Sequence, residues 1–396
     1  MKLKKINNLD YFEISGTLFL SGIEENGVLK SDGSNYILSF NTKIELEFDE
    51  SIDECQFLTV KGEKLFLRYG VRSLYNLNFP GKTEYEYVFT QIWLSVSHTD
   101  IPETFDSVSI KFSGLKKNIN HTPFNIKHNR VDNEYIVSID RENLKKEIIS
   151  LNEISLYSLC NMNNKIYRFN ESKFQYENVL KLEYKNFIDS EKCISDALNI
   201  AYIFSFITNE KHKIESVILS SNDNSYKVFL DLPFDFKEYH KSSITYFTND
   251  FFRNYLSNIY SFFHNNRDSF EDIFSSYIKL MYTPKFIDHY LVDLLKINEG
   301  LHRRFVPNDK IYLVDRYKDL QDYLKSIVNY DDSLHDYLKN FRHYHSHYFS
   351  PSEKPTYSKD NIINISKYTL QLHKSFIMFK IGIPSSEIIS LLKCTH

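Results

Sequence analysis

The sequence predicts an α+β protein in which a β-rich N-terminal domain precedes a mainly helical C-terminal domain. Apolar and polar residues alternate from Lys43 to Asp49 and again from Tyr135 to Ile139, which is the period of a half-buried strand. From about Ser190 onward the apolar spacing becomes that of helices, and after about Tyr246 it stays helical almost to the end. The order of the two patterns along the chain separates the two domains.

The N-terminal domain is expected to span residues 1–185 as antiparallel strands. Turn-forming pairs separate the apolar runs at Asp32-Gly33, Lys61-Gly62 and Pro80-Gly81, because glycine and proline favour turn backbone conformations. Many short strands joined by turns predict a sandwich or a barrel-like sheet.

The C-terminal domain is expected to span residues 186–396, with its core at about 246–396. Ser190 is a candidate cap for a first helix, and a hairpin is expected from residues 214–220 and 226–232. Pro284 is placed to begin a long helix that continues to Phe305, and Pro351 follows a later helix.

Composition limits the classes of function. The 396 residues are enough for two domains, and 42% hydrophobic with 25% charged residues is ordinary for a folded chain. A formal net charge of −4 argues against a protein that coats nucleic acid through bulk charge, but it permits a local basic cleft.

The four cysteines are scattered without metal-ligand spacing, which fits reduced thiols in a cytoplasm. No apolar run is long enough for a signal peptide or a membrane span, so no membrane partner is expected.

The segment from Lys339 to Pro351 contains the residues best suited to chemistry. Arg342 is followed five residues later by His347, with Tyr344 and Tyr348 nearby. Histidine has an unperturbed pKa of about 6.5 and suits proton transfer, and arginine holds two phosphate oxygens with a permanent charge. Cleavage of RNA through its own 2′-hydroxyl needs a base, an acid and such a cation, and it needs no metal or other cofactor.

Helix geometry leaves two alternatives for this segment. Arg342 and His347 differ by about 140° around an ideal helix, so they cannot share one narrow stripe. Either the helix loosens before Pro351, or both residues line a wide groove between two subunits. A metal site is a rival interpretation, because three imidazoles are available at His343, His345 and His347.

The same segment resembles the Arg-Asn-Tyr-x-Thr-His-Tyr signature of ApeA-like HEPN proteins. Arg342, Tyr344, His347 and Tyr348 match the signature, and Ser346 replaces its threonine. His343 is the departure, because the family usually has asparagine there.

Two further regions carry the resemblance. The stretch from Phe286 to Phe305 is similar to the family's long helix that ends in Leu-His-Arg, and it places Glu299 near the cleft. Weaker matches to the family's N-terminal region lie at residues 12–18, 27–29, 92–94 and 105–108.

The resemblance implies an all-α HEPN bundle that acts as a metal-independent endoribonuclease, with Arg342 and His347 as catalytic residues. The supporting residues are His343, Tyr344, Ser346, Tyr348 and Glu299. It also implies a homodimer or higher oligomer in which two copies of the motif build one cleft. The setting it implies is bacterial anti-phage defence by abortive infection, in which a phage component acts on the N-terminal domain and host RNA such as tRNA is cut to a 2′,3′-cyclic phosphate.

Two alternatives of other classes remain open at this point. The helical domain could bind RNA or a partner protein without cutting it. The histidine cluster could instead serve a metal-dependent hydrolase. Separately, Glu299 and Arg303 lie four residues apart on the expected long helix, and without a role in the cleft they would form a solvent-facing ion pair of a few tenths of a kcal/mol.

Overall fold

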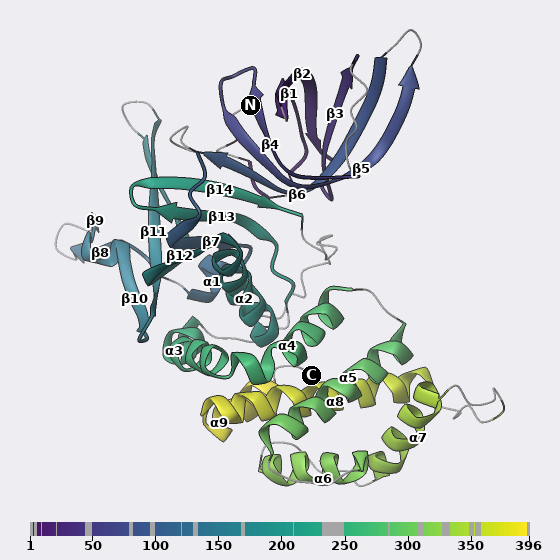
Figure 1. Cartoon of the computed structure of the whole chain (residues 1–396). Coiled ribbons are helices and arrows are strands. Elements are labelled where there is room, and N and C mark those ends of the chain that lie inside the picture. Colours follow the sequence, from purple (N-terminus) through teal and green to yellow (C-terminus); the bar gives the residue numbers. More distant parts are fainter. Residues whose placement is uncertain are drawn as a thin grey trace. The chain divides into compact units, whose positions relative to one another are not determined.

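Figure 1 shows the chain in a computed structural model, with strands in the first part of the sequence and helices in the last part. The chain divides into two units, a β unit of residues 1–201 and 212–235 and a helical unit of residues 202–211 and 236–396. The residues that the structure describes are 3, 6–8, 10–20, 22–43, 50–78, 82–95, 100–119, 121–129, 134–167, 171–208, 210–231, 249–283, 286–306, 312–326, 333–347, 352 and 358–393.

Six strands of the β unit close into a barrel. They are β1 Phe12–Leu20, β2 Ile23–Ser31, β3 Tyr36–Thr42, β4 Ser51–Thr59, β5 Lys64–Asn78 and β6 Lys82–Ser95. Their antiparallel pairings run β6, β3, β2, β1, β4, β5 and back to β6. The barrel-like alternative of the sequence analysis is therefore the one present.

Alternation explains why the barrel has an apolar interior. Tyr36, Leu38 and Phe40 of β3 are buried at every second position, and Tyr87 of β6 lies opposite Leu38 in the register. Gly70 of β5 fits this interior because a Cβ there would lie 2.5 Å from the Phe89 ring.

A second group of six strands extends from the barrel. The order is β10, β11, β12, β7, β13 and β14, and β14 pairs with the C-terminal half of β6. Their bounds are β7 Thr104–Phe112, β10 Lys145–Ser150, β11 Ile154–Tyr167, β12 Glu171–Asp189, β13 Ile214–Ser221 and β14 Asn224–Leu230. Strands β8 Phe124–Asn129 and β9 Glu134–Ile139 form a separate two-stranded sheet, and the short elements α1 Leu115–Ile119 and η2 Glu142–Leu144 complete the unit.

The hairpin after residue 210 changes the expected domain boundary. The strands β13 and β14 form as expected, but β13 pairs with β7, with Val217 opposite Ile110, so the hairpin belongs to the β unit. The division after residue 185 thus differs from that of the structure, because long-range pairing places this hairpin inside the larger sheet.

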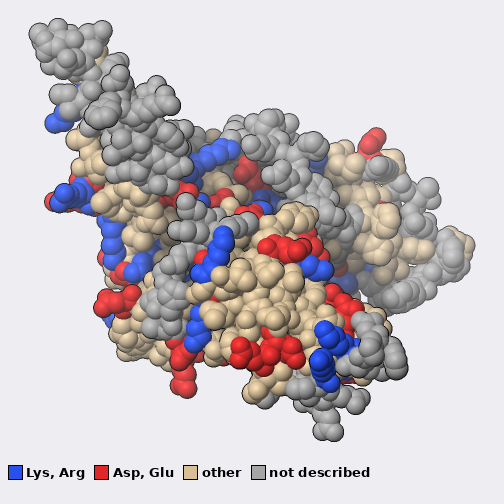
Figure 2. Space-filling model, turned by 90° about the horizontal axis from the view of Figure 1, so that it is seen from above, with Lys and Arg blue, Asp and Glu red and all other residues tan. Residues whose placement is uncertain are grey.

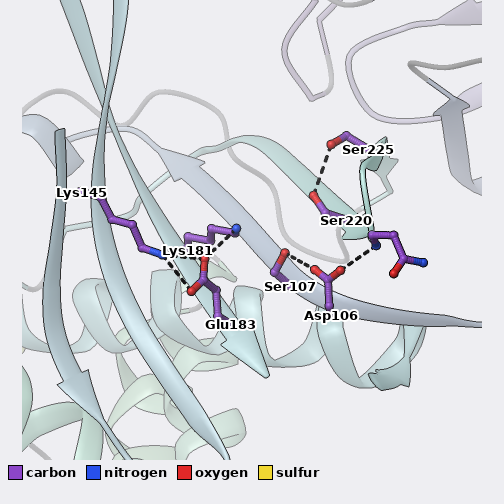
Figure 3. A network of polar contacts seen from close by, with 8 residues as sticks. Asp106, Ser107, Lys145, Lys181, Glu183, Ser220 and Ser225 are labelled. Carbon is purple, nitrogen blue, oxygen red and sulfur yellow. Dashed lines mark hydrogen bonds and ion pairs between the residues drawn. The ribbon is translucent and has the colours of Figure 1, made fainter. Parts of the chain in front are cut away.

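Two sets of polar contacts in this sheet involve partly exposed side chains. Figure 3 shows Glu183 of β12 between Lys145 and Lys181, with Nζ–O distances of 2.9 and 2.8 Å. The carboxylate of Asp106, labelled in the same view, accepts a hydrogen bond of 2.7 Å from the backbone N–H of Asn222, which fixes the β13–β14 turn against β7.

The expected turns are partly confirmed. Asp32-Gly33 joins β2 to β3 and Lys61-Gly62 joins β4 to β5, and both glycines have positive φ. The strand expected at Tyr135 to Ile139 is β9. The alternating run at 44–49 and the turn at Pro80-Gly81 lie outside the described residues, as do Pro284 and Pro351.

Helix α2, Ser190–Thr208, begins in the β unit and ends in the helical unit. Its cap is Asp189, whose carboxylate accepts the Lys192 amide at 2.8 Å, and Ser190 is the first helical residue. The expected cap at Ser190 is therefore wrong by one position, because the acidic side chain before it takes the capping role.

The helical unit consists of α3 Asn249–Asn265, α4 Arg267–Tyr282, α5 Ile287–Phe305, α6 Leu313–Leu324, α7 Ser333–His347, α8 Lys359–Ile381 and α9 Ser385–Lys393. Helix α5 packs against α4, α6, α7 and α8, so it is central within this unit. Aromatic rings fill much of the core, and Phe206 from the end of α2 contacts Phe263, Phe274 and Tyr277. The expected mainly helical C-terminal region is confirmed at this coarse level.

Candidate functional site

Helix α7 carries both residues of the Arg-x4-His segment. Arg342 lies within the helix, and His347 is its last residue. The side chains of Ser346 and His347 and the whole of Tyr348 lie outside the described residues. The pairing of Arg342 with His347 therefore stays a prediction, and the site is built from Arg342.

The Arg342 guanidinium is held by Glu299 of α5. Arg342 Nη2 donates to Glu299 Oε2 at 2.7 Å, across 43 residues of sequence. Glu299 is buried, with 8% of its surface exposed. A charge-assisted bond of this length to a buried carboxylate fixes the arginine more firmly than an exposed ion pair does.

A second arginine binds the other oxygen of the same carboxylate. Arg303 Nη2 donates to Glu299 Oε1 at 2.8 Å, one helical turn along α5. The pair expected from the spacing thus forms, but the expectation that it faces solvent is wrong for Glu299. The reason is that α5 is covered by neighbouring helices on the face that carries residue 299.

Helix α6 adds a third arginine and a second carboxylate. Arg316 Nε lies 3.9 Å from Glu299 Oε1, and Arg316 Nη1 lies 3.3 Å from His302 Nδ1. On the other side of the ring, His302 Nε2 lies 3.0 Å from Asp319 Oδ2. We call these six side chains the Glu299 cluster: Glu299, His302, Arg303, Arg316, Asp319 and Arg342.

The contacts of His302 show which of its ring nitrogens carries the proton. An arginine has only donors, so His302 Nδ1 must accept from Arg316 and carry no hydrogen. The single ring proton is then on Nε2, which donates to Asp319. His302 is neutral in this arrangement, and its ring links the carboxylate of Asp319 to the guanidinium of Arg316.

The charges of the Glu299 cluster do not cancel. Arg303, Arg316 and Arg342 are permanently positive, and Glu299 and Asp319 are the two carboxylates. With His302 neutral, the six side chains carry one net positive charge. Figure 2 shows basic side chains lying among acidic ones over the described surface in that view.

A buried polar layer supports α5 beside the cluster. Asn298 donates to Tyr317 Oη at 3.3 Å and to the Thr369 carbonyl at 3.1 Å, and its side-chain oxygen lies 2.9 Å from His373 Nδ1. Burial raises the pKa of Tyr317 and lowers that of His373 to about 3. Both groups are therefore neutral near pH 7, and they fix the rotation of α5 through hydrogen bonds rather than charge.

The remaining residues of the segment lie on different parts of α7. His343 is exposed, whereas Tyr344 is half-buried and its ring meets that of His345 edge-on with centroids 5.1 Å apart. The His345 ring also lies 4.6 Å from the Phe341 ring. Among the described residues no group of three or more His, Cys, Asp or Glu side chains could hold a metal ion, and the His347 side chain is not among them.

Sequence reasoning missed Arg316 and Asp319. Both lie on α6, three residues apart, and their spacing places them on one face of that helix. Asp315, Lys318 and Asp322 are equally charged neighbours. The sequence therefore offers no signal that selects the inward-facing pair.

No family model matches the chain, and neither a curated protein nor a solved structure matches it. Within the described part of the chain, no helix has both the length and the apolar character needed to cross a membrane.

Proposed function

We propose that the helical unit is a metal-independent endoribonuclease of the HEPN kind, with Arg342 and His347 as its catalytic residues. The observation that carries the proposal is the Glu299–Arg342 bond of 2.7 Å within a cluster that has one net positive charge. It supplies the oriented cation that phosphodiester cleavage needs, on the helix that ends at His347.

The proposed reaction divides the work between two residue types. His347 takes the proton of the RNA 2′-hydroxyl, the 2′-oxygen attacks phosphorus, and the 5′-oxygen leaves with a proton supplied by a second imidazole. Arg342 stabilises the extra negative charge on the non-bridging oxygens. Glu299 positions Arg342 without contacting substrate, and Tyr344 and Tyr348 stack on splayed bases.

A second imidazole is available when two copies of the chain face each other. We propose a homodimer in which two α7 helices form one cleft, as the ApeA-like HEPN resemblance implies. The RNA would be host RNA such as tRNA, cut during phage infection to stop growth. Ser346 and His343 would support the cleft beside the catalytic pair.

The rival function is a binding module that grips RNA without cutting it. One observation favours it. Arg342 already donates one guanidinium N–H to the carboxylate of Glu299, so its role could be to bind RNA or to stabilise the helix packing, without catalysis. The two functions differ only in whether His347 transfers a proton.

Single substitutions at the two catalytic positions test the proposal. His347→Ala and Arg342→Ala should each lower the RNA cleavage rate by at least about 10²-fold, while RNA binding is retained in His347→Ala. Arg304→Ala is the matched control, since Arg304 bonds Ser269 and Asp272 of α4 instead of Glu299. Cleavage should persist in excess EDTA, and the active species should sediment as a dimer. Cleavage by His347→Ala at the wild-type rate contradicts the proposal, and loss of wild-type activity in EDTA favours the metal-dependent hydrolase.

The β unit would act as the sensor of a phage component. Its separate core supports this division of labour, because the unit forms its own barrel and sheet. A trigger that activates a hundredfold must bind the active arrangement more tightly by about 2.7 kcal/mol. Exchange of the β unit for that of a relative with another phage range should transfer the range. An unchanged range after the exchange would leave the β unit as a scaffold.

A further inference from the structure

Arg303 is the member of the Glu299 cluster most open to solvent. Its side chain is 59% exposed and that of Arg342 is 29% exposed, whereas those of Glu299 and Arg316 are only 11% and 8% exposed. Arg303 and Arg342 bond different oxygens of one carboxylate. Two water-accessible guanidinium groups are thus held side by side by one buried anchor.

The buried arginine beneath them is incompletely satisfied. Arg316 Nε has no hydrogen-bond partner among the described residues, and neither has Arg342 Nε. Arg316 Nε approaches Glu299 only to 3.9 Å. The positive charge of this buried arginine is therefore incompletely neutralised by the cluster's own carboxylates, which favours an anion at the exposed guanidinium groups beside it.

The size of the charge excess selects the kind of anion. The cluster carries one net positive charge, which a phosphodiester balances with its single negative charge. A phosphomonoester carries about −1.5 to −2 near neutral pH and would leave the site negative. Guanidinium groups fork onto two oxygens of a phosphate as they do onto a carboxylate, so Glu299 holds them in the geometry that such a ligand needs.

We infer that Arg303 and Arg342 form a phosphodiester-binding site for the backbone of a single-stranded nucleic acid, with Arg303 as a ligand-contacting residue and Arg316 as a positioning residue. The inference rests on the proposed function for the choice of RNA as the natural ligand. The site itself stands on the arginine geometry alone.

Binding of short single-stranded DNA tests the site without turnover, because DNA lacks the 2′-hydroxyl that the proposed cleavage requires. Arg303→Gln should weaken this binding about tenfold at low salt. It should also reduce the slope of log K against log salt by about 0.7, the effect of losing one phosphate contact on a single strand. Loss of packing alone would not change that slope.

Arg304→Gln is the matched control, because the same residue type one position further along α5 is held by Asp272 at 3.1 Å. It should leave both the affinity and the salt slope close to those of the wild type. Glu299→Gln should weaken DNA binding and lower RNA cleavage, because Arg303 and Arg342 both lose the carboxylate that holds their guanidinium groups in place. The helical circular dichroism of each variant shows whether it is folded.

The outcomes separate this inference from the proposed nuclease. Equal salt slopes for Arg303→Gln, Arg304→Gln and the wild type overturn the phosphodiester site, whether or not the protein cuts RNA. A reduced slope in Arg303→Gln alone, together with no RNA cleavage by the wild type, keeps the site and removes the nuclease. If Arg303→Gln does not fold, Arg303→Lys keeps the charge but not the fork, and an affinity equal to that of the wild type would then contradict the inferred fork contact.

Discussion

The β unit and the helical unit each contain a carboxylate that pairs with more than one cation, and the two carboxylates lie in different environments. In the β unit, Glu183 lies between Lys145 and Lys181, whose side chains are 47% and 26% exposed. In the helical unit, Glu299 and Arg316 are 11% and 8% exposed, and the His302 side chain that contacts Asp319 is 0% exposed. The β unit thus keeps this network near solvent, whereas the helical unit buries several charges together.

The difference matters because removal of one partner has a small effect on stability in an exposed ion pair and a large effect in a buried one. An exposed ion pair adds little to the free energy of unfolding, since water stabilises the separated charges almost as well as the pairing does. A buried charge costs several kcal/mol of desolvation and is tolerated only with well-placed partners. The Glu299 cluster holds a buried carboxylate, a buried arginine and a buried imidazole beside two more exposed arginines. This concentration of partly buried charge marks the cluster as a candidate for function.

The largest expected effect is on folding stability. Glu299→Ala should destabilise the helical unit by about 3–5 kcal/mol, because it leaves the buried Arg316 without its carboxylate. Glu183→Ala should cost about 1 kcal/mol or less in the β unit, because its lysines remain hydrated.

The chain offers separate probes for the two units. Trp93 is the single tryptophan of the sequence and lies fully buried in β6, so its fluorescence reports the β unit. The helical circular dichroism signal in urea reports mainly the helical unit. We compare the change in the urea transition of the helical signal in Glu299→Ala with that of the Trp93 fluorescence in Glu183→Ala. If the first change is no larger than the second, the buried and the exposed carboxylates contribute equally to stability, and the prediction is wrong.

Local sequence patterns predicted the individual strands and helices, but not the long-range strand pairings that close the barrel. The hairpin around Asn222 and the long helix to Phe305 follow from turn residues and apolar spacing, and both form. The pairing of Gly16 with Thr59, which joins β1 to β4 in the barrel, links segments that carry no mutual signal in one sequence. The same limit hid the pairing of β13 with β7 and so displaced the expected boundary.

The sequence likewise predicted some residues of the candidate site and missed others. The resemblance directed attention to Glu299 and Arg342, and the structure joins them. Arg316 and Asp319 were missed, because which face of α6 turns inward depends on its packing against α5, α7 and α8. Sequence pattern therefore identified residues on the helices named by the motif and none on the helix that completes the cluster.

The last prediction compares how the two units respond to acid. His373 of the helical unit and His212 of the β unit are both buried, and burial lowers their pKa values to about 3 and about 4. Each imidazole is neutral when folded and binds a proton in the unfolded chain below about pH 6.5. Stability from each group is therefore complete above pH 6.5 and is lost as the pH falls toward the folded pKa, by at most about 1.4 kcal/mol per pH unit.

Burial and the charge of Lys374 oppose protonation of His373. Its ring stacks on that of Tyr277 with centroids 4.9 Å apart, and its Nδ1 lies 2.9 Å from the Asn298 side-chain oxygen, so the ring is fixed inside the core. His373→Gln should therefore flatten the loss of helical-unit stability between pH 6.5 and 4.5, read from the helical signal in urea. His212→Gln should flatten the loss of the Trp93 transition instead and leave the helical one unchanged. Parallel pH slopes in both variants and the wild type would show that neither imidazole is neutral through burial, and the acid response would then belong to the carboxylates of the two units.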